Sequence, residues 1–303
     1  MRPLLTCLVP AALLLTPAVV LAKSGSPFDT LPEAKLPLAL QHDGKPVFAK
    51  MSDADVLKQV VKPLAALSKK DGKVDPSLAA FATKYSAKLP GEGTRFGLIS
   101  RVKVNGATVL LSRLASSSGE GMGAEESEAL YLLVLDAGGA IVAAGQGAAW
   151  SSNMAYADVV DGTLSADGTL VTRQHLTGGD GEREGETRTV KIASGELQKI
   201  SSRFGPDGMF RDEKSRELMA ITSLQGTFAS AVAYRARAGK PPQALEITAR
   251  DEAKGTLTVR FPKSPKDYLL SYSADRSLMT CRNPDGTVQL FQRAGLSFEE
   301  PKP

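Results

Sequence analysis

The stretch TRFGLISRVKVNGATVLLSRL, residues 94–114, indicates how most of this chain folds. Apolar residues alternate with polar ones on both sides of Asn105-Gly106, a dipeptide that favours the two-residue turn of a β-hairpin. We expect the first strand to carry its apolar side chains on one face, namely Phe96, Leu98, Val102 and Val104. The other face should carry Arg95, Arg101 and Lys103.

The same pattern continues from Thr94 to Gly205, which we predict to be a first antiparallel β region. Within it, Leu130 to Leu135 is apolar at every position, as in a central strand that is covered on both faces. Turn signals recur at Gly138-Gly139, Asp161-Gly162, Asp167-Gly168, Gly178-Gly179, Ser194-Gly195 and Asp207-Gly208. Their irregular spacing excludes the fixed period of a propeller or solenoid.

A second β region is predicted for residues 225–294, followed by a tail over residues 295–303. Six short strands with intervening turns are expected at Thr227–Arg235, Ala244–Arg250, Gly255–Phe261, Tyr268–Ser273, Ser277–Arg282 and Thr287–Arg293. Between the regions, Glu213 to Leu224 could form a helix, which makes it a candidate boundary. The sequence Leu224-Gln225-Gly226-Thr227-Phe228 loosely resembles the opening of lipocalin-like barrels, which implies a carrier of an apolar ligand.

Residues 51–90 predict a helical pair ahead of the strands. Ser52 to Asp55 resembles a capping box before a first helix, which Pro63 should bend or end. Asp75 and Pro76 favour the start of a second helix, whose apolar stripe we interpret as core: Leu78, Phe81, Ala82 and Tyr85. The preceding residues 23–50 are rich in proline and favour extended backbone that is ordered only by docking.

The first 22 residues have the features of a cleaved export signal. Arg2 precedes a largely apolar run, and Val20-Leu21-Ala22 places small residues before a cleavage site at Lys23. A membrane anchor is the alternative, but three prolines interrupt the run. We therefore expect a periplasmic or secreted, soluble bacterial protein. Its mature form keeps Cys281 alone, so it has no internal disulfide.

Composition and motifs exclude several classes of function. The formal net charge is +4 with interleaved signs, and no basic run predicts a nucleic-acid partner. With two histidines and no catalytic motif, the sequence predicts no catalytic residues, no metal and no cofactor. The acidic Gly-rich loops after Gly119 and Asp180 are interpreted as solvated loops rather than calcium sites.

One segment, Gly145 to Tyr156, suggests binding. It holds the only tryptophan, Trp150, among small and polar residues, without the alternation that buries a ring in a sheet. A partly exposed Trp beside amide and hydroxyl groups is typical of sites for sugars and peptides. Trp150, Asn153 and Tyr156 are therefore the candidate binding residues, with a core Trp as the alternative.

Together these features predict a mainly β protein: an antiparallel sandwich or meander with a small C-terminal six-strand unit and a short N-terminal helical pair. We expect an exported binding or scaffolding module for an unidentified protein or carbohydrate ligand. Two alternatives stay open: a small-barrel carrier of an apolar ligand, and a carboxylate-based hydrolase of cell-envelope or extracellular glycans. An enzyme is the less favoured of these readings.

Overall fold

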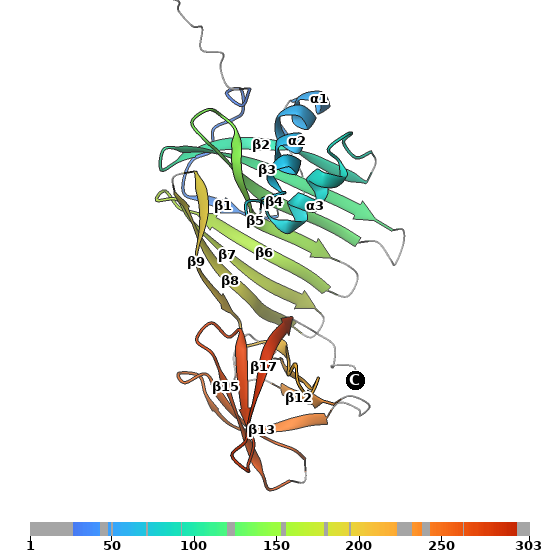
Figure 1. The fold of residues 1–303 in the computed structure, drawn as a ribbon, viewed down its shortest axis with the longest axis vertical. Coiled ribbons are helices and arrows are strands. Elements are labelled where there is room, and N and C mark those ends of the chain that lie inside the picture. The colour runs from blue at the N-terminus through green and yellow to red at the C-terminus, as the bar shows by residue number, and fades with distance from the viewer. Residues whose placement is uncertain are drawn as a thin grey trace, which may run out of the picture. The chain divides into compact units, whose positions relative to one another are not determined.

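A computed structural model describes residues 27–42, 48–49, 51–70, 72–91, 93–119, 125–152, 156–178, 181–193, 195–222, 232–237, 243–262 and 264–295. The predicted signal, residues 1–22, and Leu224 to Phe228 lie outside the described residues. The chain is mainly β, with one large antiparallel sheet, one closed barrel and short helices (Figure 1). This confirms the predicted fold class. No helix in the described part of the chain has the length and apolarity to cross a membrane.

The large sheet is a meander in which each strand pairs with the next. Its consecutive strands are β2 (Thr94–Val104), β3 (Ala107–Ser118), β4 (Glu125–Leu135), β5 (Ile141–Ser152), β6 (Tyr156–Leu164), β7 (Thr169–Gly178), β8 (Gly181–Ala193) and β9 (Glu196–Phe204). The predicted hairpin at Asn105-Gly106 is confirmed, because both residues have positive φ, 49° and 77°, between β2 and β3.

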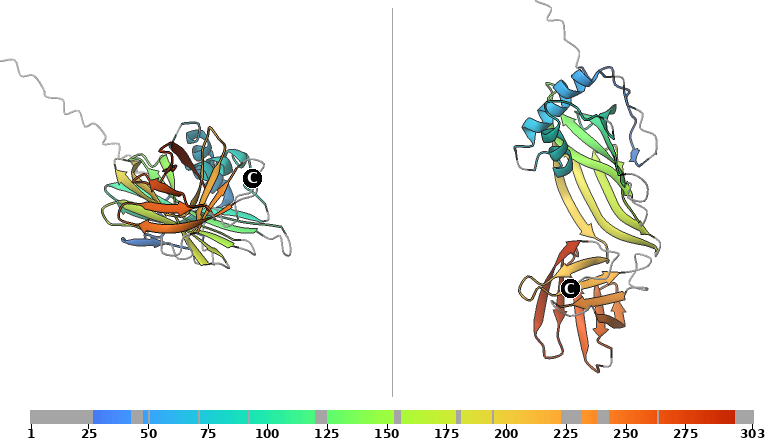
Figure 2. Two further views of the ribbon diagram at one scale, coloured as in Figure 1. Left: turned by 90° about the horizontal axis from the view of Figure 1, so that it is seen from below. Right: turned by 90° about the vertical axis from the view of Figure 1, so that its right-hand side faces the viewer.

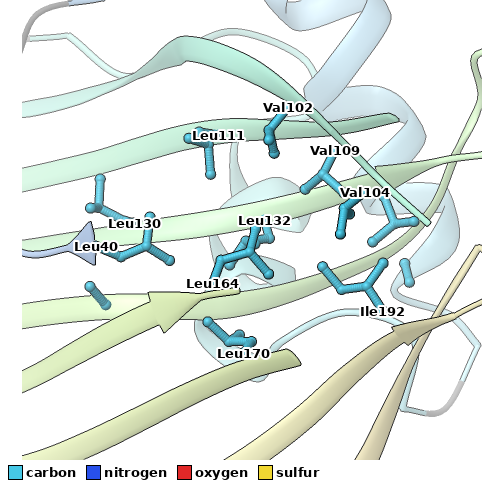
Figure 3. Packing of buried hydrophobic residues seen from close by; sticks show 13 residues of the cluster. Leu40, Val102, Val104, Val109, Leu111, Leu130, Leu132, Leu164, Leu170 and Ile192 are labelled. Carbon is cyan, nitrogen blue, oxygen red and sulfur yellow. The ribbon is translucent and has the colours of Figure 1, made fainter. Parts of the chain in front are cut away.

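Both faces of the sheet are covered, as predicted from β4. Leu130, Leu132 and Val134 belong to a buried cluster with Leu40 of the N-terminal segment (Figure 3). Tyr131 points to the opposite face, where its hydroxyl contacts a helix. Figure 2 shows the helices on one face of the sheet and the N-terminal segment on the other.

The N-terminal segment contributes a short strand, β1 (Leu38–Leu40), to the sheet. β5 pairs with β6 only over Ala149–Ser152, and further along β6 the partner is β1, with Leu40 opposite Gly162. A Cβ on Gly162 would lie 1.9 Å from the carbonyl oxygen of Gly147. The turn predicted at Asp161-Gly162 is therefore wrong: this glycine lies inside β6, where backbones approach closely.

A β-bulge between Leu98 and Ser100 overturns the predicted faces of β2. Leu98 pairs with Ser112, whereas Val102 pairs with Val109 after one extra residue in β2. Because the bulge shifts the alternation by one, Phe96 lies beside Phe81 on the helical face and Val102 joins the opposite cluster.

The two helical segments begin directly after the predicted capping residues, Ser52 and Asp75. Ser52 accepts a hydrogen bond from the backbone of Asp55 ahead of α1 (Asp53–Val56), and Asp75 caps α3 (Pro76–Lys84) through Ser77. Pro63 does not end the first helix, which continues as a π-helical turn, η1 (Leu57–Val61), into α2 (Lys62–Leu67). The Lys62 N–H bonds to the carbonyl of Leu57, five residues back, and this wide turn precedes the proline.

The barrel contains eight antiparallel strands, closed by pairing of the first with the last. They are β10 (Gly208–Arg211), β11 (Leu218–Thr222), β12 (Val232–Ala236), β13 (Gln243–Asp251), β14 (Thr256–Arg260), β15 (Asp267–Tyr272), β16 (Leu278–Arg282) and β17 (Val288–Gly295). The six predicted strands correspond to β12 to β17, of which the first is described only from Val232, and the expected six-strand unit is wrong in number because β10 and β11 also belong to the barrel. The helix expected at Glu213–Leu224 is wrong, because β11 places Met219 and Ile221 in the barrel core.

The interior of the barrel is filled by its own side chains. Its buried residues are Phe210, Met219, Ile221, Ala233, Leu245, Leu257, Val259, Leu270, Met279, Cys281 and Phe291. Burial raises the pKa of the Cys281 thiol, which fits the interpretation of this cysteine as a small core residue.

Candidate functional site

The structure describes two of the three predicted site residues, Trp150 and Tyr156. Trp150 lies in β5 and is half-buried, and Tyr156 begins β6 with 45% of its surface exposed. Asn153 lies outside the described residues. Trp150 therefore lies in a strand although its segment lacks the alternation that suggests one, and the small residues beside it have a packing role. A Cβ on Gly147 would come within 2.7 Å of both Leu132 and Leu40.

One side of the Trp150 indole is already covered. The His42 ring stacks on it at 4.4 Å between centroids and 5° between planes. Glu128 is the cross-strand partner of Trp150, and its Oε2 atom lies 3.2 Å from His42 Nδ1. The N-terminal segment is thus fastened to the sheet through this tryptophan.

Beneath this stack lies a buried ion pair. Arg113 Nη2 is 2.6 Å from Glu128 Oε1, and the two side chains are 2% and 7% exposed. A cleft of about 270 Å³ opens beside them, which we call the Trp150 cleft, and His42, Arg95, Ser117 and Glu128 line it with Trp150. Both oxygens of the Glu128 carboxylate are therefore engaged, one by Arg113 and the other by His42.

A larger cavity of about 530 Å³ lies on the helical face of the sheet, and we call it the α3 cavity. Residues of α3 and of strands β2 to β7 surround it. Its walls are mainly apolar and aromatic, from Phe81, Tyr85, Leu114, Tyr131, Ala149 and Val160. Trp150 borders both spaces, but its ring lies on the side of Glu128 and His42.

A chain of hydrogen bonds connects Tyr131 to the start of α3. Ser77 donates its hydroxyl proton to Asp75 Oδ1 at 2.5 Å, so it accepts from Tyr131 Oη at 3.0 Å. Burial raises the pKa of Tyr131 to about 12, against a smaller lowering by Ser77, and the phenol stays protonated. Since the Tyr131 hydroxyl donates its hydrogen bond to Ser77, the Tyr131 oxygen can act only as an acceptor toward the cavity.

Another polar group of the cavity is Asp158 of β6, which is half-buried. Gln174 of β7 places its Nε2 atom 3.0 Å from each carboxylate oxygen. The other end of this amide accepts from the backbone N–H of Glu186 at 3.5 Å. A Cβ on Gly185 would come within 2.7 Å of Gln174, so this glycine makes room for the amide.

Sequence reasoning missed the α3 cavity because its lining is spread over seven elements. Only the aromatic stripe of α3 signalled it, and that stripe was interpreted as core; Phe81 is indeed buried, whereas Tyr85 is half-buried at the cavity. Among the described residues no group of His, Cys, Asp and Glu is arranged to hold a metal ion. No protein-family model, curated protein or solved structure matches this chain.

Proposed function

We propose that this protein is an exported, soluble binding module that takes a small ligand in the α3 cavity. The size and lining of this cavity are the main support for the proposal. A volume of about 530 Å³, mainly apolar walls and a few oriented polar groups are the usual properties of small-molecule sites. Export rests on the signal-like residues 1–22.

Two observations favour this proposal over the alternatives. The packed barrel core leaves its interior occupied by the protein's own side chains, which disfavours a carrier of an apolar ligand there. Glycan hydrolysis needs two cooperating carboxyl groups. The α3 cavity offers Asp158, whereas the carboxylate of Glu128 is engaged by Arg113 and His42.

The test uses N-phenyl-1-naphthylamine, an uncharged dye whose emission rises in apolar surroundings. We expect saturable binding of one dye per chain. Ala149→Phe should abolish it, because Ala149 lines the α3 cavity and the ring would occupy that space.

Ala115→Phe is the matched control, since Ala115 lines the Trp150 cleft. Dye binding that survives Ala149→Phe but is lost in Ala115→Phe would move the site to the Trp150 cleft. Binding that neither variant changes would refute the proposal. Both variants should keep the far-ultraviolet circular dichroism of the wild type.

A further inference from the structure

We infer that the ligand of the α3 cavity is an organic cation, whose ammonium group binds Asp158 and whose apolar or aromatic body packs against Phe81, Tyr85 and Leu114. This inference rests on the proposed function and adds the chemical class of the ligand. It follows from the direction of the polar groups in the cavity, the free acceptor capacity of Asp158 and the aromatic walls.

Two polar groups of the cavity, whose hydrogen bonds fix their direction, present acceptors. The Asp158 carboxylate is an acceptor at both oxygens. Tyr131 offers its oxygen lone pairs, because its hydroxyl hydrogen is donated in a hydrogen bond to Ser77. Gln174 turns its NH₂ toward Asp158 and its oxygen toward the backbone of Glu186. A ligand that donates hydrogen bonds would therefore satisfy Asp158 and Tyr131.

Asp158 has acceptor capacity to spare. A carboxylate accepts about four hydrogen bonds, and in the described part of the chain Gln174 alone supplies a donor, from a single nitrogen. The carboxylate is half-buried beside apolar walls, where a positive ligand group would interact with it more strongly than in water.

The one cationic side chain among the described lining residues does not neutralise this carboxylate. Lys84 Nζ lies 5.1 Å from the centroid of the Tyr85 ring instead. The contact shows that an aromatic face at the cavity accepts a cation. Aromatic rings beside a carboxylate are a typical environment for organic ammonium groups.

The experiment compares three probes that share one phenyl ring: 2-phenylethylammonium, 2-phenylethanol and 3-phenylpropionate. Dissociation constants are measured by ligand-observed NMR titration at pH 7. We expect the ammonium to bind about tenfold more tightly than the alcohol, because a charge-assisted hydrogen bond contributes about that factor. The carboxylate should bind most weakly.

Asp158→Asn should reduce the affinity of the ammonium to near that of the alcohol, and the uncharged alcohol should lose much less affinity than the ammonium does. Glu126→Gln is the matched control, because it removes an exposed carboxylate of β4 outside the α3 cavity, and it should preserve the preference. A further test uses the wild-type protein alone. Raising NaCl from 10 to 500 mM should weaken the binding of the ammonium more than the binding of the alcohol, because salt screens charge interactions.

The outcomes separate the two proposals. If Ala149→Phe blocks 2-phenylethanol but the ammonium has no advantage, or keeps it in Asp158→Asn, the cationic class is refuted and the binding module stands. A preference for 3-phenylpropionate refutes it too and points to Lys84. If neither the dye nor any probe binds in a manner sensitive to Ala149→Phe, the proposed function itself fails.

Discussion

Removal of the Glu128 carboxylate should destabilise the large sheet strongly. Arg113 is 2% exposed and lies 2.6 Å from this carboxylate, so Glu128→Ala removes a counter-charge from a buried guanidinium. Breaking a buried ion pair from one side costs about 3–5 kcal/mol. The substitution also removes the contact of Glu128 with His42. With a urea m-value of about 2 kcal/mol/M, the midpoint should fall by roughly 2 M.

Trp150 makes the assay specific to this sheet. It is the only tryptophan of the chain and the cross-strand neighbour of Glu128, so its fluorescence follows the large sheet and not the barrel. Urea titrations of the wild type and Glu128→Ala are compared with Glu126→Ala, an exposed position two residues earlier. That control should shift the free energy of unfolding by less than about 0.5 kcal/mol.

The double variant Arg113→Met/Glu128→Leu provides the second arm. If the cost of Glu128→Ala comes from removing the counter-charge of Arg113, replacing both partners with apolar residues should restore most of the lost stability. A loss below about 1 kcal/mol in Glu128→Ala, or a double variant as unstable as the single one, would show that burial of Arg113 does not govern stability here.

Three further predictions concern other parts of the molecule. Val259→Asp should lower barrel stability by several kcal/mol in thermal circular dichroism, whereas Thr258→Asp should cost under about 1 kcal/mol, because Val259 is 1% exposed and Thr258 faces outward; equal losses would contradict the register. Trp150→Ala should lower the free energy of unfolding, followed by far-ultraviolet circular dichroism, by about 1–2 kcal/mol, because the ring is only half-buried. A loss of about 3–5 kcal/mol, as for a fully buried Trp, would show that the ring is a core residue. A hydrogen bond from Lys191 lowers the pKa of Asp167 to about 2, so this contact stabilises the fold fully above pH ~4 and is lost as the pH falls toward 2; an NMR titration that places the pKa of Asp167 near 4 would refute it.

Local chemistry made several elements predictable. The Asn105-Gly106 turn needs positive φ at both residues, and the caps at Ser52 and Asp75 act through neighbours two or three residues away. The apolar run of β4 also predicted a strand covered on both faces, because the burial of each position can be inferred from the polarity of the residue at that position.

The features that could not be predicted from the sequence depend on contacts between distant segments. The bulge after Leu98 inverts a face without any change in the alternating pattern, and Gly162 resembles a turn glycine until the carbonyl of Gly147 is placed beside it. The apolar residues Leu218 to Ile221 fit a helix or a strand equally well, and barrel closure decides between them. The α3 cavity was missed on the same ground, since Asp158 and Tyr131 become neighbours of α3 only in the folded sheet.

The pairing of β1 with β6 constrains the order in which this chain can fold. Among the described strands β1 is synthesised first, yet Leu40 pairs with Gly162, which lies far along the chain. Until this pairing forms, the matching edge of β6 has unpaired backbone groups, an arrangement that recruits foreign strands. Such long-range closure slows folding and prolongs exposure of that edge. The proline-rich segment therefore completes the sheet late, and a chain that lacks it would be prone to self-association.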